Sequence, residues 1–204
     1  MARLLPLFPL ELVLLPGETL PLHIFEPRYK EMIGECVDSK QPFGLVRAME
    51  KQGLARVGCS ADIVTVTKTY EDGRMDILTH GQRRFEVLDV NQERAFVQAD
   101  VLYFDDEPDG DAPSSEQCQR ALTLQRELLS LGGLEQEMDA SHPQLSFHLA
   151  GHVPLDLDFK QMLLGVRSEK ERLEALIEYY EKLLPRLRRA MKARVKSGGN
   201  GHVM

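Results

Sequence analysis

The sequence predicts an α+β protein in which a strand-rich half precedes a helical half. Residues 1–104 contain short segments rich in Val, Ile, Thr and aromatic residues, separated by turn signals. Residues 114–196 instead carry apolar side chains at three- and four-residue spacing, which is typical of helices. The stretch between them reads DDEPDGDAPSSE and has no periodicity, so we predict an acidic linker over residues 105–113. We expect the glycine-rich residues 197–204 to form a disordered tail.

The first elements are predicted around a proline-rich start. Apolar runs over residues 10–15 and 20–25 are expected to be strands, separated by Pro16 and Gly17, a pair that favours a turn. Pro27 then suits the first position of a helix, which its spacing of apolar residues extends to about residue 37.

Strand signals resume after this helix. The segments are residues 43–49, 61–70, 75–80, 85–90 and 95–104. Their connections are short, and two of them resemble hairpin turns. Many short strands with one early helix favour a small barrel or curled sheet.

The helical half has readable helix ends. Ser114 and Gln117 form a predicted capping box, and the glycines at 132 and 133 end that helix. Shorter helices are expected over residues 145–151 and 156–165. A long final helix starts near Ser168 and continues past Pro185, where we expect a kink because proline removes a backbone hydrogen bond.

Composition narrows the function classes. The chain has 204 residues and a net charge of −7, which disfavours binding to a phosphate backbone and favours a cytosolic protein. Cys36, Cys59 and Cys118 lack close pairing and are expected to be buried free thiols. No apolar run approaches the roughly 20 residues of a membrane span, and prolines interrupt the apolar start that could imitate a secretion signal.

No motif for catalysis or a cofactor is recognisable. The sequence has no phosphate-binding G-x-x-x-x-G-K-[ST] loop, no dinucleotide fingerprint after a strand and no G-x-S-x-G elbow. His148 and His152 are four residues apart with His142 nearby, but the predicted helix is short and no acid lies between them. We therefore expect capping or surface roles for these histidines, with no metal and no cofactor.

The C-terminal end is strongly basic. From residue 182 onward the chain has bases but no acid: Lys182, Arg186, Arg188, Arg189, Lys192, Arg194 and Lys196. Such cations complement the negative pole of a helix dipole. They also leave open a contact with an acidic partner or with the acidic linker.

Several separated segments resemble one protein family. They are LPLFPLELVLLPGETLPLHIFEPRYKEMI, FGLVRAME with VGCSADI, DGRMDILTHGQRRFEVLDV, and KQMLLGVRSEKERLEALIEYY, covering most of residues 4 to 180. They resemble, in the family's order, the N-terminal substrate-binding domain of Lon-type ATP-dependent proteases. The resemblance implies a six-stranded PUA-like pseudo-barrel with one helix, followed by a helical subdomain. The sequence is similar to stand-alone forms of that domain, since it holds neither an ATPase loop nor a Ser-Lys dyad.

The resemblance implies a non-enzymatic module that binds unfolded or degron-bearing polypeptide, or a partner protein. Within HIFEPRY we expect mainly structural roles, with Phe25 and Tyr29 in the core and Pro27 at the helix start. Glu26 and Arg28 are candidates for an ion pair, either with each other or with Arg83 or Arg84. The remaining possibility is a peptide-binding rim. Its candidate residues are Leu22, His23, Glu26 and Arg28.

Further structural positions and two other functions complete the expectations. Gly81, Arg84 and Phe85, in GQRRF, are expected to serve register and turn geometry, as are Pro16 and Gly17. An enzyme of unrecognised type that uses the barrel cleft is the first alternative. RNA binding through the basic C-terminal helix is the second, and the acidic remainder of the chain argues against it.

Overall fold

The protein is described from a computed structural model, which places residues 4–50, 52–107 and 112–198. Its contacts divide the chain into two units, and each is described by itself. Unit 1 comprises residues 1–107 and Pro154–Arg167, and unit 2 comprises Pro108–Val153 with residues 168–204. The sequence-based boundaries differ, because they assign residues 154–167 to the helical half.

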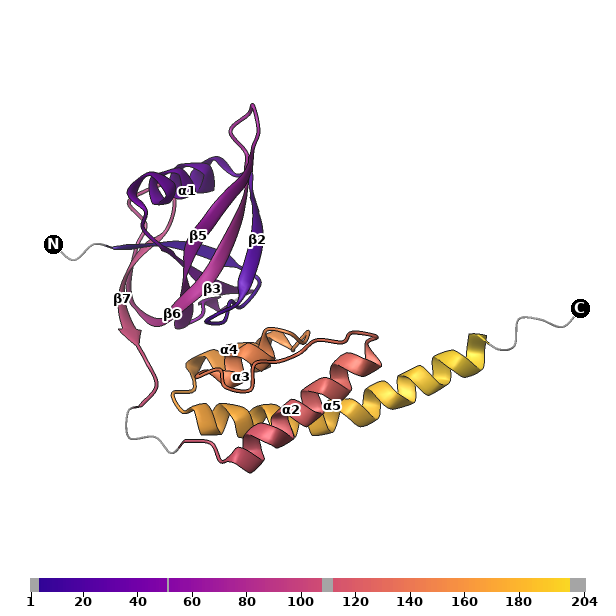
Figure 1. The fold of residues 1–204 in the computed structure, drawn as a ribbon. Coiled ribbons are helices and arrows are strands. Elements are labelled where there is room, and N and C mark those ends of the chain that lie inside the picture. The colour runs from indigo at the N-terminus through magenta and orange to yellow at the C-terminus, as the bar shows by residue number, and fades with distance from the viewer. Residues whose placement is uncertain (1–3, 51, 108–111, 199–204) are drawn as a thin grey trace, which may run out of the picture. The chain divides into compact units, whose positions relative to one another are not determined.

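Unit 1 is a strand-rich sheet that closes on itself (Figure 1). Its elements are β1 (Leu5–Leu10), β2 (Thr19–Ile24), α1 (Pro27–Ser39), β3 (Phe43–Met49), β4 (Gly53–Leu54), β5 (Val57–Thr69), β6 (Met75–Asn91), β7 (Gln98–Phe104) and α4 (Leu157–Gly165). The strands follow the order β1-β7-β6-β5-β3, and a parallel pairing of β1 with β3 completes the ring. The predicted mixed α+β class is confirmed, with β4 as a short additional strand.

Three strand predictions are corrected. The predicted strand at residues 10–15 lies earlier, at β1, while Val13, Leu14 and Leu15 are buried outside any strand. An apolar run fits a buried connection as well as a strand, so the pattern did not separate them. The segments 75–80 and 85–90 form one strand, β6, which continues through Gly81. The strand predicted to begin at residue 95 begins at Gln98, the first residue of β7.

The core of unit 1 lies inside the ring. Leu5, Leu7, Val46, Phe85 and Ala99 form a buried cluster there. Phe85 is fully buried, and a Cβ atom added at Gly44 or Gly58 would lie within 2.7 Å of its ring. Glycines at these places therefore make room for the aromatic side chain.

Gly81 is a second position that requires the absence of a side chain. Its N–H donates to the carbonyl of Glu18, and its own carbonyl accepts from Gly17, both at 2.9 Å. A Cβ atom at position 81 would lie 2.2 Å from the carbonyl oxygen of Leu15. Gly17 itself has a positive φ of 79° in the turn. The two glycines thus hold the turn before β2 against the middle of β6.

Helix α4 is tied to the ring by its polar side chains. Lys160 donates to both carboxylate oxygens of Glu18, at 2.7 and 2.9 Å. Arg47 donates to Asp158 at 2.6 Å, and Gln161 donates to the carbonyl of Val57 at 3.0 Å. These bonds explain why residues 154–167 group with unit 1 rather than with the helices beside them in sequence.

Unit 2 consists of α2 (Ser115–Leu131), α3 (Leu145–Ala150) and α5 (Glu169–Gly198). The predicted capping box is present, because Ser114 and Gln117 exchange their side-chain and backbone hydrogen bonds. Pro185 lies inside α5, and the helix continues past it. Residues 197 and 198, predicted to belong to the tail, are in α5, whereas residues 199–204 and linker residues 108–111 lie outside the described part of the chain.

The core of unit 2 includes a buried ionic group. Arg172 is fully buried and donates to Ser146 Oγ at 2.9 Å and to Glu169 Oε2 at 2.7 Å. Glu169 also accepts from the backbone N–H and the hydroxyl of Ser146. The guanidinium lies 4.2 Å from the ring centroid of Phe147. This network joins α3 to the start of α5.

Candidate functional site

Three aromatic side chains meet on the surface of unit 1 beside the start of α1. The rings of His23 and Phe25 are stacked, with centroids 6.0 Å apart. The ring of Tyr70, just after β5, approaches His23 edge-on at 5.8 Å. We call His23, Phe25 and Tyr70 the aromatic surface.

The backbone explains why Phe25 points outward. Ile24 ends β2 with its side chain buried, and Phe25 is the next residue, so the alternation of side chains along the strand directs Phe25 to the opposite side. Its side chain is 58% exposed. The prediction that Phe25 belongs to the core is therefore wrong, whereas Tyr29 is buried and packs on Phe8 at 4.1 Å between ring centroids. That burial raises the pKa of Tyr29.

Asp76 holds two members of the aromatic surface in place. Its Oδ1 lies 2.5 Å from Nδ1 of His23, and its Oδ2 accepts from the Tyr70 hydroxyl at 2.9 Å. The contact follows from the sheet, because His23 is the register partner of Asp76 in the β2–β6 ladder. The bond from His23, and then that from Tyr70, lowers the pKa of the Asp76 carboxyl.

Cations surround Tyr70. The ammonium of Lys68 lies 4.3 Å from the centroid of the Tyr70 ring, and the guanidinium of Arg74 lies 4.9 Å from it. Such contacts keep long basic side chains next to an aromatic face. Sequence reasoning missed Tyr70, Asp76 and both cations, because they come from the β5–β6 hairpin, far along the chain from residue 23.

Of the four residues predicted to form a peptide-binding rim, the structure places three close together and one apart. Arg28 pairs with Glu26 at 2.8 Å, as one of the predicted alternatives has it, and its guanidinium lies 4.5 Å from the Tyr29 centroid. His23 belongs to the aromatic surface close by. Leu22 does not join them, since it is the register partner of buried Ile77 and so lies on the opposite face of β2 from His23.

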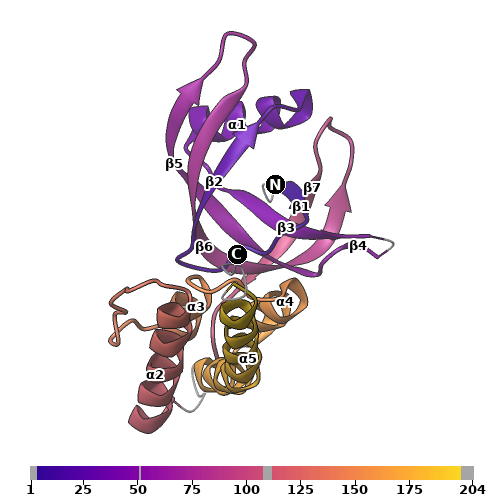
Figure 2. The same ribbon diagram turned by 90° about the vertical axis from the view of Figure 1, so that its right-hand side faces the viewer.

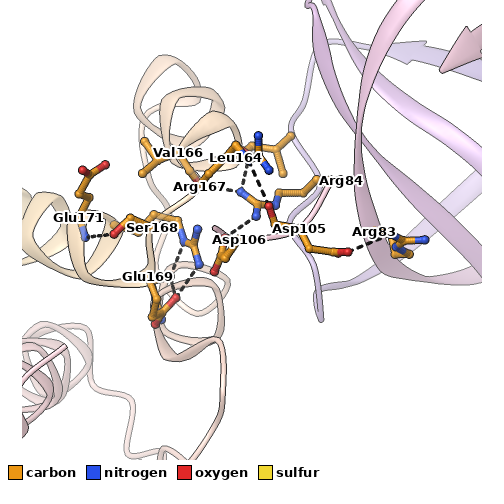
Figure 3. A network of polar contacts seen from close by, with 12 residues as sticks. Arg83, Arg84, Asp105, Asp106, Leu164, Val166, Arg167, Ser168, Glu169 and Glu171 are labelled. Atoms are coloured by element: carbon orange, nitrogen blue, oxygen red, sulfur yellow. Dashed lines mark hydrogen bonds and ion pairs between the residues drawn. The ribbon is translucent and has the colours of Figure 1, made fainter. Parts of the chain in front are cut away.

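Arg84 forms its ion pair with Asp106 rather than with Glu26, and its contacts are structural (Figure 3). It is 2% exposed and donates to the carbonyls of Leu164 and Val166, at 3.3 and 2.6 Å, and to Asp106 at 2.5 Å. It therefore satisfies carbonyl groups at the C-terminal end of α4, which a helix cannot satisfy itself. Its neighbour Arg83 is exposed and pairs with Asp105 at 3.0 Å.

The three histidines of unit 2 are neighbours, with His142 stacked on His148 and His152 edge to face with His148. The ring centroids of His142 and His148 lie 4.9 Å apart, as do those of His148 and His152. Burial, with the two neighbouring imidazoles next, lowers the pKa of His148. Within residues 4–50, 52–107 and 112–198, no group of three His, Cys, Asp or Glu side chains is arranged to hold a metal ion.

The three cysteines differ in their burial. Cys36, Cys59 and Cys118 are free, but only Cys36 and Cys59 of the three are buried; Cys118 is partly exposed, so the prediction of a buried thiol is wrong at this position. Burial raises the pKa of Cys59 to about 12, so its thiol stays protonated at neutral pH. No helix in the described part of the chain is long and apolar enough to cross a membrane.

Unit 1 is thus a strand-rich sheet that closes on itself and carries an exposed aromatic surface. The substrate-binding domain model of ATP-dependent protease La (LON) matches residues 4–182, so the chain belongs to this family. The family is one of substrate-recognition modules, which are themselves non-catalytic.

Individual relatives agree with the family match. The chain is 25% identical over 187 residues to Lon protease 1 of Hydrogenovibrio crunogenus, covering 84% of this chain and 23% of that protein. It is 30% identical over 110 residues to Lon protease of Parabacteroides distasonis, covering 50% of this chain and 13% of that protein. The chain thus spans about a quarter or less of the length of these relatives.

Solved structures share the fold. The Lon N-terminal domain protein from Xanthomonas campestris superposes with a TM-score of 0.69 and is 29% identical, covering 87% of this chain and 98% of that chain. The N-terminal domain of Mycobacterium avium complex Lon protease has a TM-score of 0.63 at 17% identity, covering 88% of this chain and 98% of that chain, and supports the fold alone.

Proposed function

We propose that this protein recognises unfolded or degron-bearing segments of other polypeptides, or a partner protein, through the aromatic surface. The observation that carries the proposal is Phe25, which is 58% exposed within a motif whose neighbours Ile24 and Tyr29 are buried. An exposed aromatic ring beside a second ring provides contact area with little loss of conformational entropy on binding.

The polar groups around the rings fit a polypeptide ligand. Glu26 and Arg28 form an exposed pair next to Phe25, and each can exchange its partner for a charged group of a ligand. On the other side Lys68 and Arg74 flank Tyr70. We propose His23, Glu26 and Arg28 as contacts from the predicted rim, together with Phe25 and Tyr70. Leu22 of that rim would support β2 from its other face.

Two of the described basic side chains of the C-terminal helix already have acidic partners. Arg188 pairs with Glu127, and Lys182 pairs with Glu178, so part of its charge is already offset by acids of unit 2. The proposed recognition therefore rests on unit 1.

The test is a binding titration with an unfolded ligand. A reduced, carboxymethylated globular protein carrying a fluorophore serves as the probe, without nucleotide. Phe25→Ala should weaken its binding at least about tenfold, which corresponds to roughly 1.4 kcal/mol. Leu102→Ala is the matched control, because Leu102 is 55% exposed on β7 and lies outside the aromatic surface. Equal binding by both variants, or no binding by the unchanged protein at about 100 μM, would refute the proposal.

A further inference from the structure

Strand β5 has an edge that is open over half its length. One side of β5 pairs with β6 as far as Thr69. The other side pairs with β3 only at three positions, the last of which joins Phe43 to Ala61. Beyond Ala61, no strand in the described part of the chain pairs with this side. Residues 63–69 therefore present unpaired backbone N–H and C=O groups that a further strand can bind, although the β5–β6 ladder has register shifts between Ile63 and Thr65 and between Val66 and Lys68.

The opposite edge of the same sheet is protected. There β2 pairs with β6 alone, and Pro21 lies in the middle of that ladder. A proline in a paired strand turns its nitrogen away from the partner, so the outer edge of β2 lacks a donor at this position. The free part of β5 contains no proline. An added strand is therefore accepted at β5 rather than at β2.

A groove with apolar lining runs along the open edge. Its volume is about 480 Å³, and it is lined by the end of α1 and the start of the free edge. Helix α1 lies beside β5 in both Figure 1 and Figure 2. Val37 of α1 and Val64 of β5 are 37% and 60% exposed here. A strand added to β5 would place alternate side chains against these valines.

The charge along the groove is positive, in contrast with the protein as a whole. Lys40 lines the groove, and Lys68 lies on the free edge. Lys30 of α1 reaches the far end, where it donates to the carbonyl of Asp72 at 2.9 Å. Asp62 is the acid among the groove-lining residues. Lys40 and Lys68 thus outnumber Asp62 along this edge, while Lys30 lies beside the acidic residue Asp72, and the excess of one positive charge favours a ligand that carries a carboxylate.

We propose that an extended segment of another polypeptide, apolar at alternate positions and carrying acidic residues, binds by adding a strand to residues 63–69 of β5. The backbone of the segment bonds to the open edge, and its apolar side chains enter the groove. This inference rests on the proposed function, because it states how the main chain of a recognised polypeptide is held while the aromatic surface contacts its side chains.

The probe is a fluorescein-labelled peptide of roughly eight residues, alternating Val and Thr between terminal glutamates. Two isomers carry N-methyl groups on alternate amides, one on the odd positions and the other on the even positions. Only one set of amides faces β5 in an added strand. We expect one isomer to bind at least about tenfold more weakly than the parent peptide, and the other to bind like the parent.

Amide hydrogen exchange localises the bound peptide. Backbone amides within residues 63–69 should exchange at least about tenfold more slowly when the parent peptide is bound. Val64→Glu, which brings a negative charge to the groove, should weaken peptide binding at least about tenfold. Leu88→Glu is the control, since Leu88 is 56% exposed on β6 and distant in register from the free edge.

The outcomes separate this inference from the proposed function. In one outcome the unfolded protein binds, and Phe25→Ala abolishes this binding, but both N-methylated isomers bind like the parent peptide and the exchange of the β5 amides is unchanged. Strand addition is then refuted, while polypeptide recognition stands. If neither the peptide nor the unfolded protein binds, both proposals fail. Unequal isomers together with slowed exchange in β5 support strand addition.

Discussion

The Nδ1 atom of His23 lies 2.5 Å from Oδ1 of Asp76, joining the end of β2 to the start of β6. The pair sits in the middle of the aromatic surface, because His23 stacks on Phe25 and Asp76 also accepts from the Tyr70 hydroxyl. Asp76 thus fixes the rings of His23 and Tyr70 relative to one another, and under the proposed function this would reduce the entropy lost on binding.

This pair predicts a measurable titration. The pKa of Asp76 is lowered by its bonds to His23 and Tyr70, so it should lie below the ordinary value of about 3.9. A carboxyl whose pKa is depressed in the folded state contributes stability above its unfolded pKa, and that contribution is lost as the pH falls through the folded value. His23→Ala should move the pKa of Asp76 upward. Carbon-detected NMR of the Asp76 carboxyl checks this, and an unchanged titration in the variant contradicts the assignment.

Arg84 should be essential for the stability of unit 1. Arg84→Met removes the buried partner of Asp106 and the donor for the carbonyls at the end of α4, so we expect a loss of about 3–5 kcal/mol in the free energy of unfolding. Arg83→Met, at the exposed neighbouring position, should cost less than about 1 kcal/mol. Urea unfolding measures both. Similar losses for the two variants would contradict the structural role of Arg84.

Two glycine-to-alanine changes should act in opposite directions. Gly81→Ala places a Cβ atom 2.2 Å from the carbonyl oxygen of Leu15, and the required shift should cost roughly 1–3 kcal/mol. Gly34 lies inside α1, and nothing beyond its own helix backbone comes within 4 Å of the place that an alanine Cβ would take. Gly34→Ala should therefore stabilise the protein by about 0.5–1 kcal/mol. Thermal unfolding gives the sign of each change. A stabilising Gly81→Ala would show that the approach of Leu15 to β6 is not needed.

Local chemistry made some elements predictable. Pro27 at a helix start, the Ser114–Gln117 capping box and the turn at Gly17 are each set by a few neighbouring residues, and the structure has all three. The family was also recognisable, because its motifs are contiguous strings.

Contacts across the sheet were not predictable in the same way. Asp76 reaches His23 only through the register of β2 with β6, and Arg84 reaches the end of α4 from a strand far earlier in the chain. Phe25 was misassigned to the core, although the alternation along β2, which buries Ile24, exposes the residue after it. Helix α4 has ordinary helical spacing, and its place beside the ring depends on bonds to residues distant in sequence, among them Glu18, Arg47 and Val57.

The most direct test of the central claim is photo-crosslinking from the aromatic surface. A benzoylphenylalanine is placed at position 25 in one variant and at position 102 in another, where the native Leu102 is similarly exposed. Each is illuminated with the fluorescent unfolded protein and, as a control, with its folded form. The account predicts a crosslink from position 25 to the unfolded protein alone and little from position 102. Equal crosslinking from both positions, or none from position 25, would contradict recognition of polypeptides at this surface.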